Sequence, residues 1–266
     1  MTGFFTLLLK PFENGHAFPG IIFISLLTGA VMLVLFRLTS NQAAMKEAKT
    51  KISAYFLEMR LYKEEISTVM ASQRRILRAN LDYMKLAVVP AMVMIVPVIL
   101  IMVQLNLRYA QSGLLPGQIA MIKVKVEDGV DVMREGIRLS STEGIAKASP
   151  AVRITSLGEV DWKIKVTEPG IHHITISSNS GETTLPVFGV TRLIPIYRDF
   201  RKGSVWEAIL NPGSPRVPDG VPIESIEVRY PSLAFSFGFV ELSWLWTFLV
   251  ISMAFGFCLK FIFKVE

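Results

Sequence analysis

Three apolar stretches, each about as long as a bilayer is thick, constrain this chain more than any other feature. They read AFPGIIFISLLTGAVMLVLFR, LAVVPAMVMIVPVILIMVQLNL and LSWLWTFLVISMAFGFCLKFIF. A helix needs about 20 apolar residues to cross the hydrocarbon core. The sequence is also 51% hydrophobic, with a mean hydropathy of +0.45. We therefore predict an integral membrane protein with an α-helical three-span core.

The spans divide the chain into six parts. Helix 17–38 and helix 85–107 are the first two spans, and residues 231–266 hold an interfacial segment, the third span and a short tail. Pro90 and Pro97 should kink the second span. Residues 1–16 open with MTGFFTLLLKPF, which predicts an interfacial helix that ends near Pro11.

Residues 39–84 form a polar segment without Gly or Pro, which predicts helix. Apolar residues recur every three or four positions, which is typical of a coiled-coil seam; they are Ile52, Tyr55, Met59, Tyr62, Ile66, Val69, Ile76 and Tyr83. Two antiparallel helices of about 20 residues each would bring both ends back to one membrane face. The turn would lie near 64–72, where Ser67, Thr68 and Ser72 can cap. A helix lying flat on the membrane is the alternative geometry.

The positive charge of the chain is concentrated in this segment, which argues against nucleic acid as the reason for a net charge of +6. Basic short loops face the cytoplasm, so we predict the N-terminus outside and the C-terminus, with Lys260 and Lys264, inside. Tyr230, Trp244 and Trp246 would then form an outer aromatic belt. The basic residues of the arm that we single out are Lys46, Lys49, Lys51, Arg60, Lys63, Arg74, Arg75 and Arg78.

Residues 108–230 alternate polar and apolar positions between frequent turns, which predicts an extracytoplasmic immunoglobulin-like β-sandwich. VTEPGIHHITISS has the form of a strand, a turn and a returning strand, and IESIEVRYP that of a last strand. LIPIYRDFRKGSVWEAIL departs from the pattern and predicts a helical or interfacial excursion. Trp162 and Trp206 should pack in the domain. Cys258 is the only cysteine, so no intrachain disulfide can form.

The sequence contains no nucleophile elbow, phosphate loop or zinc-protease motif, so we expect no enzyme, no cofactor and no metal site. His172 and His173 are neighbours on a predicted strand and point to opposite faces, so they cannot share one metal. One should lie in the core and the other on the surface.

Polar residues at membrane depth are candidates for function. Arg37, at the end of the first span, either reaches the headgroups or points into a groove between the spans. The polar residues that could share this groove are Ser25, Thr28, Gln104, Asn106 and Ser252. Their hydroxyls could equally bond their own helix backbone. Ser25–Gly29 and Ser252–Gly256 are pairs of small residues four apart, which favour close helix approach.

This arrangement of spans and basic hairpin resembles the core of the YidC-type membrane insertases, especially the three-span archaeal YidC-like proteins and the insertase subunit of the endoplasmic-reticulum membrane complex. FRLTSNQAAMKEAKTKISAYFLEMRLYKEE is similar to the run of that superfamily from its first core span into its hairpin. The resemblance covers residues 1–107 and 240–266 and does not include the outer domain.

The resemblance implies a membrane insertase or chaperone of a prokaryotic cytoplasmic (inner) membrane, in which Arg37 faces a hydrophilic groove that receives the short polar tail of a client. It implies membrane lipids and newly made membrane proteins as partners, and the ribosome as a candidate for the arm. The additional outer domain indicates a dedicated client or an extracytoplasmic protein partner. The alternative is a non-catalytic membrane scaffold or assembly subunit that binds its partner through the outer β-domain.

Overall fold

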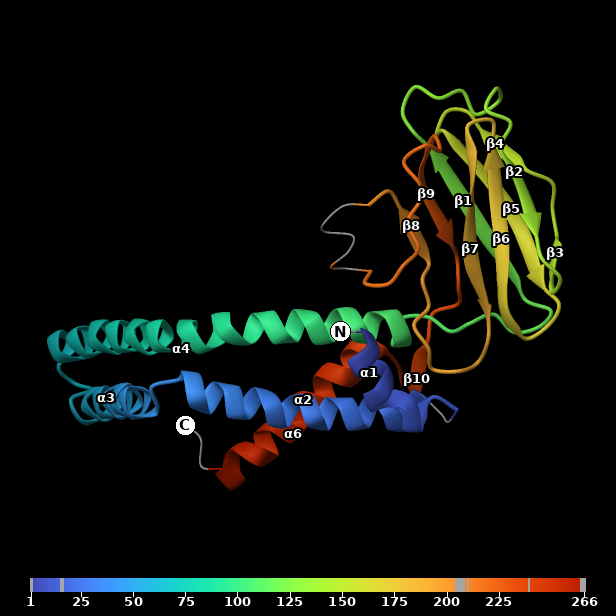
Figure 1. The fold of residues 1–266 in the computed structure, drawn as a ribbon. Coiled ribbons are helices and arrows are strands. Elements are labelled where there is room, and N and C mark those ends of the chain that lie inside the picture. Colours follow the sequence, from blue (N-terminus) through green and yellow to red (C-terminus); the bar gives the residue numbers. More distant parts are fainter. Residues whose placement is uncertain (1, 15–16, 204–208, 210, 239, 264–266) are drawn as a thin grey trace. The chain divides into compact units, whose positions relative to one another are not determined.

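The computed structural model describes residues 2–14, 17–203, 209, 211–238 and 240–263 (Figure 1). The chain forms two compact units. The β unit comprises Met1–Gly20 and Met102–Trp244, and the helical unit comprises Ile21–Ile101 and Leu245–Glu266. Helices α2 and α4 contribute residues to both units.

Three helices in the described part of the chain are long and apolar enough to cross a membrane. They are α2 (Ala17–Thr39), α4 (Ile66–Tyr109) and α6 (Trp244–Phe263). Large apolar side chains stay exposed along them, among them Val34, Met92 and Phe257. Soluble proteins rarely leave contiguous apolar surface of this kind uncovered. These helices therefore have the lengths and surfaces of a membrane protein.

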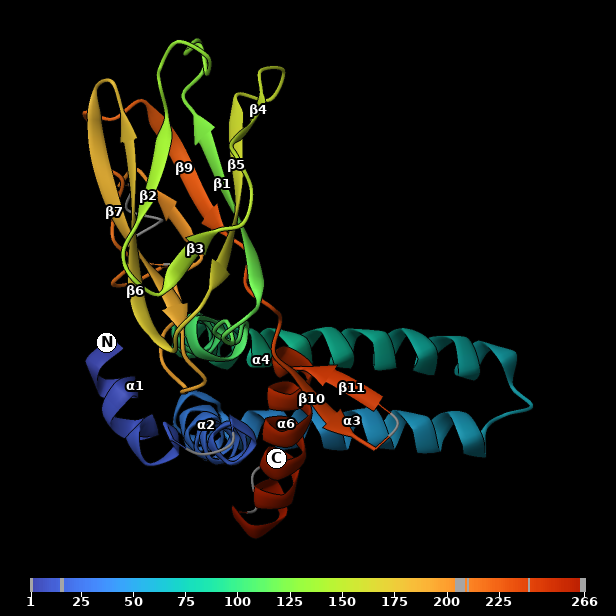
Figure 2. The same cartoon turned by 90° about the vertical axis from the view of Figure 1, so that its right-hand side faces the viewer.

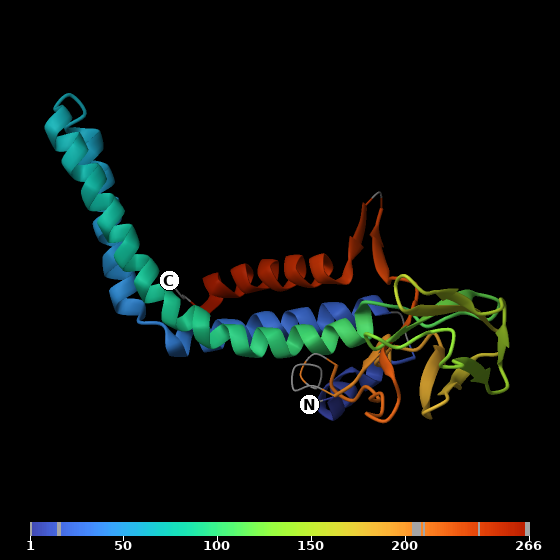
Figure 3. The same cartoon turned by 90° about the horizontal axis from the view of Figure 1, so that it is seen from above.

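Helix α4 contains the two prolines expected inside the second span, Pro90 and Pro97. Figure 3 shows α4 bending between its polar first part and its apolar second part. A proline removes one backbone hydrogen bond and crowds the preceding turn, which explains a bend in this helix. The helix nevertheless continues from Ile66 to Tyr109, so the second half of the polar segment and the predicted second span form one continuous, bent helix.

The predicted helical hairpin is present in the helical unit. Helix α3 (Gln42–Leu61) runs antiparallel to the first part of α4, with the turn at 62–65 (Figures 1 and 3). The Asn41 side chain caps α3 by accepting a hydrogen bond from the Ala44 amide at 3.1 Å. Ser72, expected as a cap, instead lies buried inside α4.

The seam of the hairpin is built from small residues as well as the predicted apolar ones. Most of the predicted positions are half-buried, but Tyr62 and Ile66 are exposed beside the turn. Within the hairpin itself, the described buried positions are Met45 and Ala48 of α3 and Ser72 and Ala79 of the first part of α4. Small side chains let two helix backbones approach closely, and the predicted seam of large apolar residues did not include them.

The N-terminal segment forms a short helix in the β unit. Helix α1 (Thr2–Leu9) runs into the 3₁₀ turn η1 (Lys10–Phe12), which contains Pro11. The predicted helix therefore does end near this proline. Phe5 and Leu9 are buried, whereas Phe4 and Leu7 are exposed, so α1 has one covered and one open apolar face.

The described residues of the β unit form three antiparallel sheets (Figure 2). The first has the order β3-β5-β1-β9-β8, with β4 also paired to β5; its strands are β1 (Ile119–Val126), β3 (Ile145–Lys147), β4 (Val152–Ile154), β5 (Glu159–Val166), β8 (Asp199–Arg201) and β9 (Ile223–Val228). The second has the order β2-β6-β7, with β2 (Arg138–Ser141), β6 (Gly170–Ser178) and β7 (Gly181–Gly189). The third is a hairpin of β10 (Ala234–Phe237) and β11 (Val240–Ser243).

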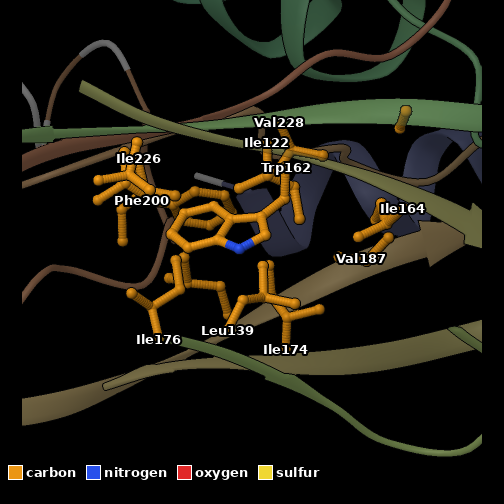
Figure 4. Packing of buried hydrophobic residues seen from close by; sticks show 14 of the residues in the cluster. Ile122, Leu139, Trp162, Ile164, Ile174, Ile176, Val187, Phe200, Ile226 and Val228 are labelled. Carbon is orange, nitrogen blue, oxygen red and sulfur yellow. The ribbon is translucent and has the colours of Figure 1, made fainter. Parts of the chain in front are cut away.

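The two larger sheets share one hydrophobic core (Figure 4). Burial alternates along β1 and β5, because successive side chains of a strand point to opposite faces. Trp162 lies in this core, as predicted, opposite Ile122 in the β1–β5 register and close to Ile174 and Ile176 of the other sheet. Trp206 lies outside the described residues.

Tyr230 belongs to the same core, and its placement in an outer aromatic belt is wrong. Its ring packs near that of Phe188, and its hydroxyl accepts a hydrogen bond from the Phe188 amide at 3.1 Å. Burial raises the pKa of the Tyr230 phenol above its ordinary value. A tyrosine close to a predicted span can thus be part of the core of the adjoining domain. Trp246, by contrast, is exposed on α6.

Three further parts of the β unit depart from the sequence pattern. Strands β5 and β6 join through the expected turn but belong to different sheets, so they do not form a hairpin. The segment expected as a helical or interfacial excursion contributes β8, which pairs with β9. The segment before α6, which was expected to lie at the membrane interface, contains the β10–β11 hairpin, which is visible in Figure 3 and was not predicted.

Candidate functional site

Arg37 is an exposed cation at the end of an apolar helix. It lies in the last turn of α2, three residues before the loop that leads into α3. Among the described residues it takes part in no ion pair and no hydrogen bond through its side chain. Its guanidinium is therefore accessible for a negatively charged or polar partner.

Two predicted groove residues of α2 are buried. The Ser25 hydroxyl donates to the Ile21 carbonyl one turn earlier at 2.6 Å, so it satisfies its own helix. Thr28 is also buried. Ser252 of α6 is partly buried and donates to the Leu249 carbonyl at 3.2 Å. The two serines thus follow the alternative in which a hydroxyl bonds its own helix backbone.

Of the small-residue pairs, Gly29 of α2 lies close to both Ser252 and Gly256 of α6. A Cβ placed on Gly29 would lie 2.9 Å from the Ser252 carbonyl oxygen and 3.6 Å from the Gly256 nitrogen. A Cβ placed on Gly256 would meet no atom within 4 Å. The close approach therefore depends on Gly29.

The other two predicted groove residues belong to the β unit. Gln104 is buried, and its side-chain oxygen accepts a hydrogen bond from Arg108 at 3.0 Å. Asn106 is exposed and lines a small hollow together with Arg198 and Asp199. Ser25, Thr28, Arg37 and Ser252 lie in the helical unit, so a single groove that contains all six residues stays a prediction.

Arg108 is a buried cation that the sequence reasoning missed. It lies in the last turn of α4, is 2% exposed, and donates to the Gln104 carbonyl and side chain at 3.2 and 3.0 Å and to the Thr6 hydroxyl of α1 at 2.9 Å. The hydrogen bond to Thr6 connects α1 to the end of α4, whereas the two to Gln104 lie within α4. The signal was present in the sequence as a basic residue directly after the predicted span, but such residues usually reach the headgroups.

The basic arm is partly engaged within the hairpin. Arg75 of α4 forms an ion pair with Glu58 of α3 at 3.1 Å and lies 6.0 Å from the centre of the Tyr55 ring. Lys51 pairs with Glu47 at 2.8 Å, and its hydrogen bond and charge lower the pKa of that carboxyl. The other predicted arm residues are exposed: Lys46, Lys49, Arg60, Lys63, Arg74 and Arg78.

The arm also has an exposed apolar side. Met70, Leu77, Leu81 and Met84 recur along α4 at steps of three, four and seven and are all exposed. Positions with this spacing share one face of a helix. The exposed surface of the hairpin therefore offers apolar side chains in addition to charge.

Neither the histidines nor the acidic residues form a metal site in the described part of the chain, where no group of three or more His, Cys, Asp or Glu side chains lies together. His172 is half-buried with Nε2 2.8 Å from the Glu168 carbonyl, and His173 is exposed. The expectation that one of them lies in the core is therefore wrong.

Comparison with known proteins found no matching family model, no matching curated protein and no matching solved structure.

Proposed function

We propose that the chain is a YidC-like membrane insertase or chaperone. In this proposal it lies in a prokaryotic cytoplasmic membrane, with the N-terminus and the β unit outside and the hairpin and C-terminus inside. It moves the short polar tail of a newly made membrane protein through a hydrophilic groove beside α2. Its function needs no covalent chemistry.

The observation that carries the proposal is the position of Arg37. An exposed guanidinium at the end of an apolar helix, directly before a basic hairpin, is placed to receive a polar or acidic segment that enters from the arm side. Moving such a segment into hydrocarbon alone is unfavourable, because its polar groups lose their hydrogen bonds to water. A cation at the mouth of the groove lowers that penalty.

The α3–α4 hairpin supports the same proposal. Its exposed lysines and arginines can attract an acidic tail, anionic lipid or ribosomal RNA, and its apolar side can hold a hydrophobic segment before insertion. Because α4 continues from the arm into the apolar part, a client bound to the arm is held at the membrane.

We further propose that the β unit is an immunoglobulin-like β-sandwich that binds an extracytoplasmic partner or client domain. Two antiparallel sheets around one core support this assignment. A chain that acted only as a scaffold would use this domain and the arm as docking sites and would not depend on Arg37.

The test is insertion of a small single-span client with a short acidic N-terminal tail into proteoliposomes that contain the purified full chain. Arg37→Ala should reduce insertion about tenfold. Lys260→Ala is the matched control, since Lys260 also lies in the last turn of an apolar helix, and it should change insertion less than about twofold. Equal insertion by the wild type and Arg37→Ala would contradict the proposal and favour the scaffold.

A further inference from the structure

Strand β7 forms the longest unpaired edge of the two larger sheets in the described part of the β unit. Its sheet has the order β2-β6-β7, so β7 pairs with a described strand only on its β6 side (Figure 2). The other edge strands are shorter, since β2 has four residues and β3, β4 and β8 have three each, whereas β7 has nine. An unpaired edge presents backbone N–H and C=O groups to which another strand can bind.

The hydrogen bonds of Phe188 show which backbone groups of β7 point outward. In an antiparallel pair, alternate residues exchange hydrogen bonds with the neighbouring strand, and the residues between them direct both backbone groups away from it. Phe188 directs its groups away from β6, because its amide donates to the Tyr230 hydroxyl at 3.1 Å and its carbonyl accepts from the Leu114 amide at 2.9 Å. Every second residue before it in β7 therefore points the same way.

Only the first part of this outward edge is open. At the other end of the strand, both groups of Phe188 are already bonded. Pro186 has no N–H, and prolines inside sheets are found where the missing N–H would face outward from an edge strand. Glu182 and Thr184 have no outward backbone partner among the described residues. The open groups are therefore the N–H groups of Glu182 and Thr184 and the C=O groups of these two residues and Pro186.

The side chains along the open edge indicate the chemistry of its partner. Glu182 and Thr184 are exposed on the outer face, whereas Thr183 and Leu185 are buried in the core. A strand added here would alternate in the same way, with apolar residues on the core side and polar residues on the outer face. Glu182 forms no ion pair among the described residues, so a lysine or arginine opposite it would be favoured.

We propose that β7 binds an extended segment of another polypeptide by strand addition along residues 182–186. The segment pairs antiparallel, accepts hydrogen bonds from the amides of Glu182 and Thr184, and donates to the three open carbonyls. It alternates apolar and polar residues and places a basic residue opposite Glu182. In strand addition the backbone hydrogen bonds provide affinity and the alternating side chains provide specificity. The inference rests on the proposed partner-binding role of the β unit and does not require the insertase activity.

The test is fluorescence anisotropy with the full chain in an uncharged detergent. The probe is a labelled peptide in which lysine alternates with valine, and we expect it to bind the wild type saturably. Thr184→Pro removes one outward N–H and should weaken binding about tenfold or more, because one carbonyl of the peptide loses its donor. The hydrogen bonds with β6 stay intact, since Thr184 directs its backbone groups away from β6.

Thr184→Ala is the matched control for the proline variant. It also removes the threonine side chain, including its 3.0 Å hydrogen bond with the Thr175 hydroxyl, but it keeps the outward N–H. It should change the affinity less than about twofold. Circular dichroism compares the folding of the two variants.

A second pair of variants tests the charge and does not depend on how the strand tolerates proline. Glu182→Lys should weaken binding about threefold or more, because it places a positive charge opposite a lysine of the peptide. Glu143→Lys changes the net charge by the same amount in the turn between β2 and β3, at the other edge of the sheet, and should have less than about half this effect.

Four results would overturn the inference. One is a wild type that does not bind the peptide. Another is equal affinity of folded Thr184→Pro and Thr184→Ala, which would show that the β7 backbone does not pair. Equal weakening by Glu182→Lys and Glu143→Lys would show attraction by net charge alone. A wild type that is dimeric by light scattering, with a monomeric Thr184→Pro, would assign the edge to a second copy. None of these results affects insertion, which the proteoliposome assay measures separately.

Discussion

The contact between α2 and α6 at Gly29 gives the sharpest prediction about the helical unit. A Cβ at this position would lie 2.9 Å from the backbone oxygen of Ser252, whereas ordinary contact begins at 3.4 Å. Because the obstructing atom is part of the α6 backbone, a side chain rotation cannot relieve the overlap. Gly29→Ala must therefore displace one helix by about 0.5 Å, the difference between these two distances.

The magnitude follows from two opposing effects. Overpacking a well-fitted contact costs about 1–3 kcal/mol. Replacing glycine by alanine inside a helix contributes up to about 1 kcal/mol in the stabilising direction. Gly256→Ala has only the second effect, since its Cβ would meet no atom within 4 Å. The difference between the two variants should therefore be about 1–3 kcal/mol, with Gly29→Ala the less stable.

The assay is unfolding of the full chain in mixed micelles by increasing amounts of sodium dodecyl sulfate, followed by circular dichroism. Both variants change one glycine to alanine in an apolar helix, so differences in detergent binding cancel. If Gly29→Ala and Gly256→Ala unfold at the same detergent fraction, α2 and α6 do not approach at Gly29 and the reasoning is refuted.

Three further variants test the β unit and the arm. Trp162→Ala should lower the free energy of unfolding by about 3–5 kcal/mol, because it empties the centre of the core, and urea denaturation measures this; a loss below about 1 kcal/mol would contradict the packing. Burial raises the pKa of the Asp161 carboxyl, so the folded state holds this proton more tightly than the unfolded state, and Asp161 contributes stability at low pH that is lost as the pH rises through the folded pKa. Asp161→Asn should therefore raise the melting temperature, compared with the wild type, more at pH 7 than at pH 3. The same difference between variant and wild type at both pH values would contradict this. Glu58→Gln should destabilise the hairpin by less than about 1 kcal/mol, because its partner Arg75 is half-exposed. This loss of stability should be smaller in 1 M salt, and a loss that does not depend on salt would contradict an ion pair.

The repeating patterns of the sequence predicted much of the fold. The apolar stretches became α2, α4 and α6, and the alternation of residues 119–126 and 159–166 became β1 and β5 with alternate side chains buried. The hairpin seam was also visible, although the turn lies at 62–65 instead of 64–72. Such periodicity can be recognised within a single segment, because each strand or helix must bury one apolar face whichever element packs against it.

Features that depend on the partner of an element were not predicted. The sequence of β5 and β6 could not reveal that the turn between them joins two sheets, and Tyr230 could not be distinguished from an interfacial tyrosine. The strands of the β10–β11 hairpin are short and lie in an apolar part of the sequence, so the alternation of polar and apolar residues along them could not be recognised.

The candidate site was predicted unevenly for the same reason. The exposure of Arg37 follows from its place in the last turn of α2, and the backbone hydrogen bonds of Ser25 and Ser252 were one of the two alternatives that a hydroxyl in an apolar helix has. Arg108 was missed because its burial depends on α1, which follows from no local pattern of α4.

The most direct test of the proposed groove is photocrosslinking during translation of a small membrane protein with a short polar tail. A photoreactive residue at Val34, one turn before Arg37, is compared with one at Ile171 of β6, which is equally exposed at 52% against 51%. We predict client adducts at position 34 that decrease when Arg37→Ala is added, and none at position 171. Adducts at position 34 that are no more frequent than those at position 171 would contradict a client path along α2.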